Sequence, residues 1–447
     1  MAQVLLKDAT LVTPQGIIQS DLLCDGGRIA KIAPQLSAPG TPVLDCHELL
    51  ALPGMIDEHV HFRDPGFPAK ATLASESRAA LLGGVTSFMD MPNTDPPTVS
   101  MTRLLEKKAK AAQQSVANYA FYLGASGDNC EELKKAPPRE IAGIKIYMGA
   151  TTGSLLVEDY ERLLEAFKAA PTLIALHCED SELIAAQERR VKNLYGEEPE
   201  MALHALIRSR DCCLNSTKLA IALAKESGAR IHILHISTQE EVTLLSEYLY
   251  GNAATRQISG EAALPHLFFS AADYARKGGL LKCNPSVKNE ADRRALVAAV
   301  ERGVLTTVGT DHAPHEAALK AQSYFKCPSG CTSVQFAWPA LLALWKRREL
   351  TLESAVKACA QQVAERYRIP DRGRLEEGCY ADIVLVNPAL PQSVDRYDLK
   401  SLCGCSVFEG EFLPARVVHT LVNGVVKVKD GTLCSEESGQ ALYFARD

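Results

Sequence analysis

Short apolar segments alternate with longer segments of helical pattern between residues 55 and 311. Parallel strands need a long crossover between them, usually a helix, so this alternation is typical of repeated βα units. Eight such units predict a TIM-like (β/α)8 barrel, and a further helical region at 338–368 should pack against it. We expect the eight strands at 55–61, 84–91, 117–124, 141–148, 172–177, 230–236, 254–261 and 304–311.

Both ends of the chain have a different pattern, with short strands separated by turn signals. Asn423-Gly424, between two alternating segments, is typical of a tight hairpin turn. Neither end alone contains many strands, so we expect the two ends to combine. The prediction is an α/β protein with three parts: residues 1–54 and 376–447 form a small β-sandwich from both termini, and residues 55–375 form the barrel.

The composition narrows the classes of function. The chain has 447 residues, 47% hydrophobic and 23% charged, and its net charge of -6 is spread along its length. This is an ordinary globular composition, without the basic run expected for nucleic acid or an apolar segment long enough for a membrane. The N-terminus does not resemble a signal peptide. We therefore expect no nucleic-acid partner, no membrane and a cytoplasmic location.

Fourteen cysteines are scattered through the chain without a disulfide framework. Cys327 and Cys331 have a spacing that could bind a metal, but no second pair accompanies them. We expect free thiols in a reducing cytosol.

Two histidines, His59 and His61, end the first predicted strand. Residues two apart on a strand face the same side, so the two imidazoles could form half of a metal site. The alternative is an exposed edge strand that carries two histidines by chance. Arg63 follows on the same face if the strand continues, and a cation beside a metal suggests an anionic substrate, which favours the metal site.

Other strand ends carry similar side chains. A TIM barrel has its chemistry at the C-terminal ends of its strands, so these residues should converge at one mouth. His232, three residues before His235, should face the opposite side of its strand, toward the helices. The residues expected at the mouth are Asn93, Lys145, His177, His235 and Asp311, in addition to His59 and His61.

Lys145 lies inside an apolar strand, where burial of its charge is costly and lowers its pKa. Such a lysine could instead extend to the surface or pair with a carboxylate. A neutral buried amine can also react with carbon dioxide to give a carbamate, whose two oxygens could bridge two metal ions. The sequence leaves these alternatives open.

Several motifs together resemble the dihydroorotases, a family of the amidohydrolase superfamily in its cyclic amidohydrolase branch. They are His59-Val60-His61-Phe62-Arg63, Met91-Pro92-Asn93-Thr94, Lys145, His177-Cys178-Glu179-Asp180, His235, Cys283-Asn284-Pro285 and Asp311-His312-Ala313-Pro314-His315. The resemblance covers nearly the whole chain. The metal motifs are shared with hydantoinases and allantoinases, whereas Arg63, the Met91–Thr94 run and Cys283-Asn284-Pro285 favour dihydroorotase.

The resemblance implies a centre of two Zn²⁺ ions per chain. His59, His61 and Asp311 would hold one ion, His177 and His235 the other, and N6-carboxylated Lys145 would bridge them. Asp311 would also be the catalytic proton carrier. Arg63, Asn93 and His315 would bind the substrate carboxylate, and Asn284 would reach the ring.

The implied reaction is the reversible cyclisation of N-carbamoyl-L-aspartate to L-dihydroorotate in pyrimidine synthesis. A hydantoinase or an allantoinase would use the same metals on another ring. A non-catalytic scaffold is a further alternative, although the set of metal ligands is complete. A small-molecule substrate is the expected partner, and the sequence is compatible with a homodimer without fixing the oligomeric state.

Overall fold

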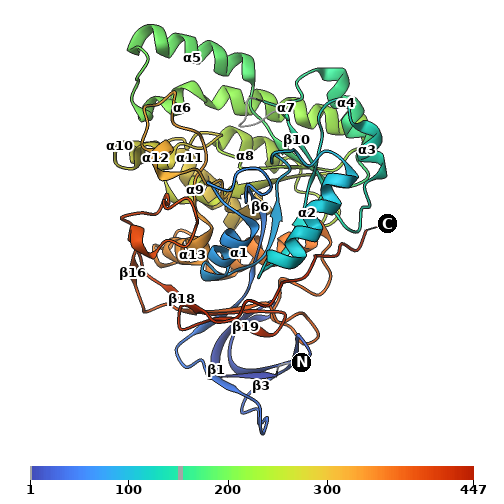
Figure 1. Ribbon diagram of the computed structural model, residues 1–447, viewed down its shortest axis with the longest axis vertical. Coiled ribbons are helices and arrows are strands. Elements are labelled where there is room, and N and C mark those ends of the chain that lie inside the picture. The colour runs from blue at the N-terminus through green and yellow to red at the C-terminus, as the bar shows by residue number, and fades with distance from the viewer. Residues whose placement is uncertain (1–2, 150–154, 447) are drawn as a thin grey trace.

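A computed structural model describes residues 3–149 and 155–446. The centre of the molecule is a parallel barrel surrounded by helices, and a sheet built from both ends of the chain lies below it in Figure 1. The predicted combination of an α/β barrel with a β-rich unit from both termini is confirmed. None of the helices in the described part of the chain combines the length and apolarity needed to cross a membrane.

The barrel strands pair in parallel in chain order. Val60 forms a parallel β-bridge with His312, and the backbone N–H of His61 donates to the carbonyl of His312 at 2.7 Å. These contacts close the barrel between its last and first strands. The strands are β6 (Met55–Val60), β7 (Val85–Asp90), β8 (Asn118–Phe121), β9 (Leu123–Gly124), β10 (Ile144–Tyr147), β11 (Ile174–His177), β12 (Ile231–Ile233), β13 (Ile258–Ala263) and β14 (Thr307–Gly309). β8 and β9 together occupy the predicted third position.

The seventh predicted strand, at 254–261, was placed too early. β13 begins at Ile258, because Asn252 accepts a hydrogen bond from the backbone N–H of Thr255 and holds the preceding segment in a turn. β13 ends at Ala263, and the side chain of Glu261 within it is completely buried.

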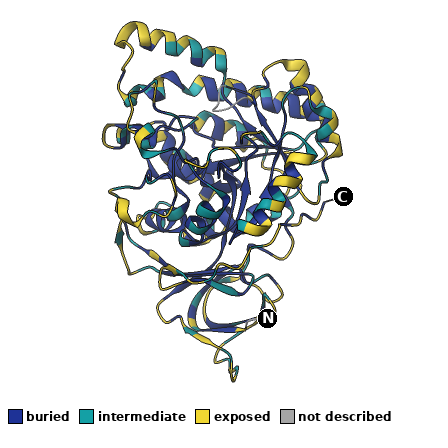
Figure 2. Cartoon of the chain, viewed as in Figure 1, coloured by how far each residue is buried: buried dark blue, intermediate teal, exposed yellow. Residues whose placement is uncertain are grey.

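Most crossover helices begin at a residue whose side chain caps the first turn, such as Thr72, Asp180 and Asn289. Exposed residues lie on the outer surfaces of the helices, and buried residues fill the barrel (Figure 2). The helices are α1 (Leu73–Leu82), α2 (Met101–Gln114), α3 (Cys130–Lys135), α4 (Tyr160–Ala169), α5 (Ser181–Tyr195), α6 (His204–Ile207), α7 (Arg210–Ser227), α8 (Gln239–Ser246), α9 (Leu264–Phe268), α10 (Tyr274–Lys277), α11 (Glu290–Glu301), α12 (Ala317–Lys320), α13 (Ala337–Lys346), α14 (Leu352–Val356) and α15 (Gln362–Tyr367).

The strands of the two termini form one nine-stranded sheet in the order β20-β19-β18-β15-β5-β1-β2-β3, with β4 beside β1. The β2–β3 turn lies against the segment that leads into β15, since the N–H of Ala381 donates to the carbonyl of Gly27. The sheet therefore encloses an apolar core shared by both termini. Its strands are β1 (Val4–Thr13), β2 (Gly16–Asp25), β3 (Arg28–Ala33), β4 (Val43–Asp45), β5 (Leu50–Pro53), β15 (Ile383–Asn387), β18 (Arg416–Val422), β19 (Val425–Lys429) and β20 (Thr432–Leu433).

A two-stranded sheet, β16 (Gln392–Ser393) and β17 (Phe412–Leu413), lies between β15 and β18 in the chain. After β20 the chain leaves the terminal sheet and runs along the barrel. There the N–H of Leu442 donates to the carbonyl of Tyr119, and the Arg446 guanidinium donates to the carbonyl of Ile141. The C-terminal segment thus ties the two parts of the fold together.

Candidate metal centre

The C-terminal ends of the barrel strands bring the predicted site residues together. His59 belongs to β6, Lys145 to β10 and His177 to β11, whereas His235 and Asp311 follow β12 and β14. One cavity at this mouth is lined by all the predicted site residues except His315, which contacts Arg63 beside it. The cavity is lined by His59, His61, Arg63, Asn93, Lys145, Tyr147, His177, His235, Asn284, Asp311, Ala313, Ser329 and Gly330.

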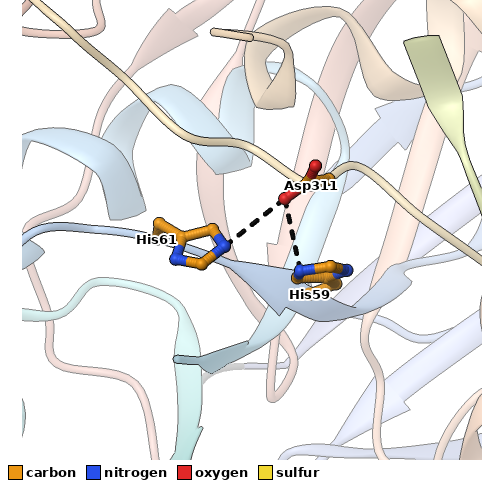
Figure 3. A group of neighbouring side chains, drawn as sticks. All are labelled: His59, His61 and Asp311. Atoms are coloured by element: carbon orange, nitrogen blue, oxygen red, sulfur yellow. Dashed lines mark ion pairs between the residues drawn. The ribbon is translucent and has the colours of Figure 1, made fainter. Parts of the chain in front are cut away.

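His59, His61 and Asp311 form the tightest cluster of possible ligands (Figure 3). The Nε2 atoms of His59 and His61 lie 3.2 and 3.4 Å from Oδ1 of Asp311. Each residue offers one ligand atom, and these three atoms all lie within 4.8 Å of one another. Two imidazoles and a carboxylate in this arrangement are suited to a divalent transition metal.

The outer nitrogens of both imidazoles are hydrogen-bonded. Nδ1 of His59 lies 2.9 Å from Oε1 of Glu261, and Nδ1 of His61 lies 2.7 Å from Oδ1 of Asn93. An oxygen acceptor at Nδ1 keeps the proton there and leaves the Nε2 lone pair free, as metal-binding histidines require. The contacts therefore fix both the tautomers and the ring orientations.

A second pair of imidazoles lies across the cavity. Nδ1 of His177 is 3.0 Å from Nε2 of His235. The other nitrogen of His177, Nε2, is 3.0 Å from Glu179, and Glu179 also forms a buried ion pair with Arg208. The Nδ1 atom of His235 has no hydrogen-bond partner among the described residues. These two histidines provide the donor atoms expected for a second ion.

Burial keeps the imidazoles neutral. It lowers the pKa of His59 to about 3, and it also lowers the pKa of His61, His177 and His235. A neutral imidazole has a free lone pair, so all four side chains are in the protonation state that a metal needs at neutral pH.

Lys145 lines the same cavity as both groups of histidines. Its side chain is completely buried, and Nζ has no hydrogen-bond partner in the described part of the chain. Burial lowers the pKa of Lys145 to about 7. An unbonded buried amine is costly to retain. Together with the imidazoles and Asp311, it gives a donor set that fits a metal centre.

Arg63 lines the same cavity as this donor set, and His315 contacts Arg63. Nη2 of Arg63 lies 3.3 Å from Nε2 of His315, and the Nε atom of Arg63 is buried without a hydrogen-bond partner in the described residues. Oδ1 of Asn284, also on the cavity wall, is likewise unpartnered among these residues. The cavity therefore presents several polar atoms that a bound molecule could satisfy.

Three of these residues have a left-handed backbone. Their φ angles are 61° for Arg63, 40° for His235 and 45° for Asp311. Positive φ is unfavourable for residues with a Cβ, and such residues are found most often at functional sites. Here the turn at each strand end directs the side chain into the mouth of the barrel.

The expectation that His232 faces the helices is wrong. Its Nε2 atom lies 3.9 Å from Glu58 on β6, across the barrel interior, and 3.0 Å from Oγ1 of Thr307. The left-handed turn at His235 breaks the alternation on which that expectation depended. His232, Glu58 and Glu261 form a second buried group of possible ligands below the cavity.

Further side chains that were not predicted from the sequence support or line the cavity. Glu179 and Arg208 orient His177, and Glu261 orients His59. Tyr147 lines the cavity, and its position two residues after Lys145 could have indicated this, since both side chains leave the same face of β10. Ser329 and Gly330, in the loop before β-bridge residue Cys331, also line the cavity.

Comparison with known proteins agrees with this arrangement. Residues 50–427 match the model of the amidohydrolase family. A dihydroorotase from Halobacterium salinarum is 33% identical, covering 97% of this chain and 98% of the relative. An allantoinase from Bacillus velezensis is 28% identical, covering 96% and 94%. The structure of an L-hydantoinase from Arthrobacter aurescens superposes with a TM-score of 0.92 at 26% identity, covering 99% of this chain and 100% of that one.

Proposed function

Because this chain belongs to the amidohydrolase family, we propose that it is a dihydroorotase. As a metal-dependent cyclic amidohydrolase it acts on a cyclic amide C–N bond. The proposed reaction is the reversible closure of N-carbamoyl-L-aspartate to L-dihydroorotate and water, a step of pyrimidine synthesis. The observation that carries the choice of substrate is the buried guanidinium of Arg63 beside the metal-binding side chains.

Arg63 is 4% exposed, and no described carboxylate forms an ion pair with it. Burying an unpaired guanidinium is costly, so the cavity favours a ligand that brings a negative charge. Dihydroorotate carries a carboxylate on its ring, and Arg63 could bind it through two parallel hydrogen bonds. Hydantoin and allantoin have no ring carboxylate to offer.

The other residues predicted to bind the substrate also lie on the cavity wall or beside it. His315 touches Arg63, and Asn93 and Asn284 line the cavity. We assign the substrate carboxylate to Arg63, Asn93 and His315, and a polar atom of the ring to Asn284. In this assignment His315 and Asn93 orient the carboxylate, while Arg63 provides the charge.

Two Zn²⁺ ions are the proposed cofactors. His59, His61 and Asp311 would hold one, His177 and His235 the other, and carboxylated Lys145 would be shared by both. When bound, the ions act as Lewis acids that polarise the ring carbonyl and activate water. The unbonded Nζ of Lys145 and the neutral imidazoles support this assignment.

The residues of the chain have distinct tasks in the reaction. In the hydrolytic direction, the Asp311 carboxylate accepts a proton from the attacking water and delivers it to the leaving ring nitrogen. Arg63 holds the ring so that its amide carbon faces Asp311, which lowers the entropic cost of the reaction. In the direction of ring closure the same proton returns through Asp311.

The runner-up function is that of a hydantoinase or an allantoinase. The L-hydantoinase and the allantoinase described above align over nearly their whole lengths, so overall similarity does not separate these substrates. A non-catalytic scaffold agrees less well, because the complete set of ligand-type side chains surrounds the cavity.

The test is a substrate panel. Purified, zinc-loaded protein should convert L-dihydroorotate and N-carbamoyl-L-aspartate into each other, with kcat/KM at least about a hundredfold above that for hydantoin or allantoin. Preferential turnover of hydantoin or allantoin would assign the runner-up function. Failure to act on any of the three rings would support the scaffold.

Three further proposals follow from the sequence. All 14 cysteines are free, which agrees with a reducing compartment, and we propose the cytoplasm. We also propose the division of the chain at residues 54 and 375, and a homodimer as the oligomeric state. Size-exclusion chromatography with light scattering tests the homodimer.

A further inference from the structure

Tyr147 ends strand β10 and lines the cavity, although nothing in the proposed reaction yet uses it. It lies two residues after Lys145, so both side chains leave the same face of the strand. The tyrosine ring is 1% exposed. Nζ of Lys145 lies 4.5 Å from the centre of the Tyr147 ring, and the ring of His177 is 6.2 Å away, centre to centre. The ring is thus fixed among the metal-binding side chains.

The hydroxyl group of Tyr147 is buried and has no hydrogen-bond partner in the described part of the chain. Buried tyrosine hydroxyls usually find a partner, because leaving one unbonded costs free energy. A tyrosine hydroxyl ordinarily carries its proton at neutral pH. It is therefore a hydrogen-bond donor available to a molecule in the cavity.

The charged neighbours of Tyr147 include Arg63, which lines the same cavity. The charged groups that act on Tyr147 are Arg63 first, then Asp311 and Asp90. Arg63 is the residue assigned to the substrate carboxylate. The hydroxyl of Tyr147 and the unpartnered Nε of Arg63 are both buried donors of the same cavity. A carboxylate can accept about four hydrogen bonds, and a bidentate guanidinium donates only two of them. A second donor can therefore bind the same carboxylate.

We infer that Tyr147 is a specificity-determining residue, whose hydroxyl donates a hydrogen bond to the ring carboxylate of the substrate beside Arg63. This inference rests on the proposed function, because it needs a substrate with a ring carboxylate. Its consequence is selectivity: a ring without a carboxylate leaves both donors unsatisfied and binds poorly.

The test is Tyr147→Phe, which removes one oxygen atom and keeps the ring. We expect KM for L-dihydroorotate to rise by about tenfold to a hundredfold, the usual loss for a hydrogen bond to a charged group, with kcat changed less than about threefold. Metal content should equal that of the wild type. Tyr119→Phe is the matched control, since Tyr119 is buried on β8 outside the cavity, and its KM should not change.

A double-mutant cycle with Arg63→Met distinguishes a shared ligand from a structural role. If both side chains bind one carboxylate, the double variant should lose less than the product of the two single losses. An unchanged KM in Tyr147→Phe, loss of metal from that variant, or strictly multiplicative losses would overturn the inference. If the wild type does not act on dihydroorotate, the proposed function fails; an active wild type with an unaffected Tyr147→Phe variant overturns only the role of Tyr147.

Discussion

The Nδ1 atom of His59 lies 2.9 Å from Oε1 of Glu261, a contact that joins strands β6 and β13 inside the barrel. Oε1 of Glu261 also accepts a hydrogen bond from the backbone N–H of His235, at 3.1 Å. A single carboxylate thus contacts the side chain of His59 and the backbone of His235, one residue from each of the two histidine groups. Metal affinity should therefore depend on a residue that would not itself bind the metal.

Glu261→Gln should weaken metal binding by about tenfold to a hundredfold, because the amide keeps the size of the side chain but is a weaker hydrogen-bond partner for Nδ1 of His59. Competition with a chelator measures the change. Glu240→Gln is the control, since Glu240 pairs with Arg210 at the surface. Equal metal affinities in wild type and Glu261→Gln would show that the contact does not tune the site.

Lys145→Ala should lose metal and activity together, because the proposed carbamate on this side chain is shared by both ions. Metal analysis and the dihydroorotate assay on the same sample measure both. Lys427→Met should keep its metal, since Lys427 is also a buried lysine but belongs to the terminal sheet. Two metals per chain in Lys145→Ala would refute the bridging role.

Arg63→Met should bind metal normally and bind substrate poorly, because Arg63 faces the cavity from outside the metal-binding set. Loss of a hydrogen-bonded charge pair costs about 2–5 kcal/mol, so KM should rise at least about thirtyfold. Lys70→Met removes a neighbouring, partly exposed charge that acts on Arg63 through space. That control should change KM only slightly. Loss of metal from Arg63→Met would contradict its assignment.

The equilibrium of the proposed reaction should depend on pH. Ring closure converts one carboxylate and a ureido nitrogen into an amide, so it consumes one proton and releases water. Lower pH should favour dihydroorotate, by about tenfold per pH unit while both carboxylates of the open form are ionised. Measuring the two compounds at equilibrium over several pH values checks this. A ratio independent of pH would mean that a different reaction is catalysed.

Much of the fold could be predicted because the barrel has a strong local pattern. Each predicted barrel strand overlaps one in the structure, since buried parallel strands are short apolar runs between helices. The site residues could be brought together because the active site of a TIM barrel lies at the C-terminal ends of its strands. This rule needs no knowledge of side-chain packing. Thus His177 and Asp311 could be placed at one mouth although 134 residues separate them in the sequence.

Other features are not revealed by hydrophobic periodicity. The local turn held by Asn252 delays β13, and the left-handed backbone at His235 reverses the direction expected for His232. Glu261 lies in a short strand without a sequence motif, and only the closed barrel shows that it meets His59. This last contact joins distant strands, so no local pattern could predict it.

The most direct test is a crystal structure of the zinc-loaded protein with L-dihydroorotate bound. We predict two metal ions, one at His59, His61 and Asp311 and one at His177 and His235. We also expect additional density on Nζ of Lys145 and the ring carboxylate against Arg63. A substrate carboxylate turned away from Arg63 would contradict this prediction. An unmodified Lys145 that is not shared by the two ions would also contradict it.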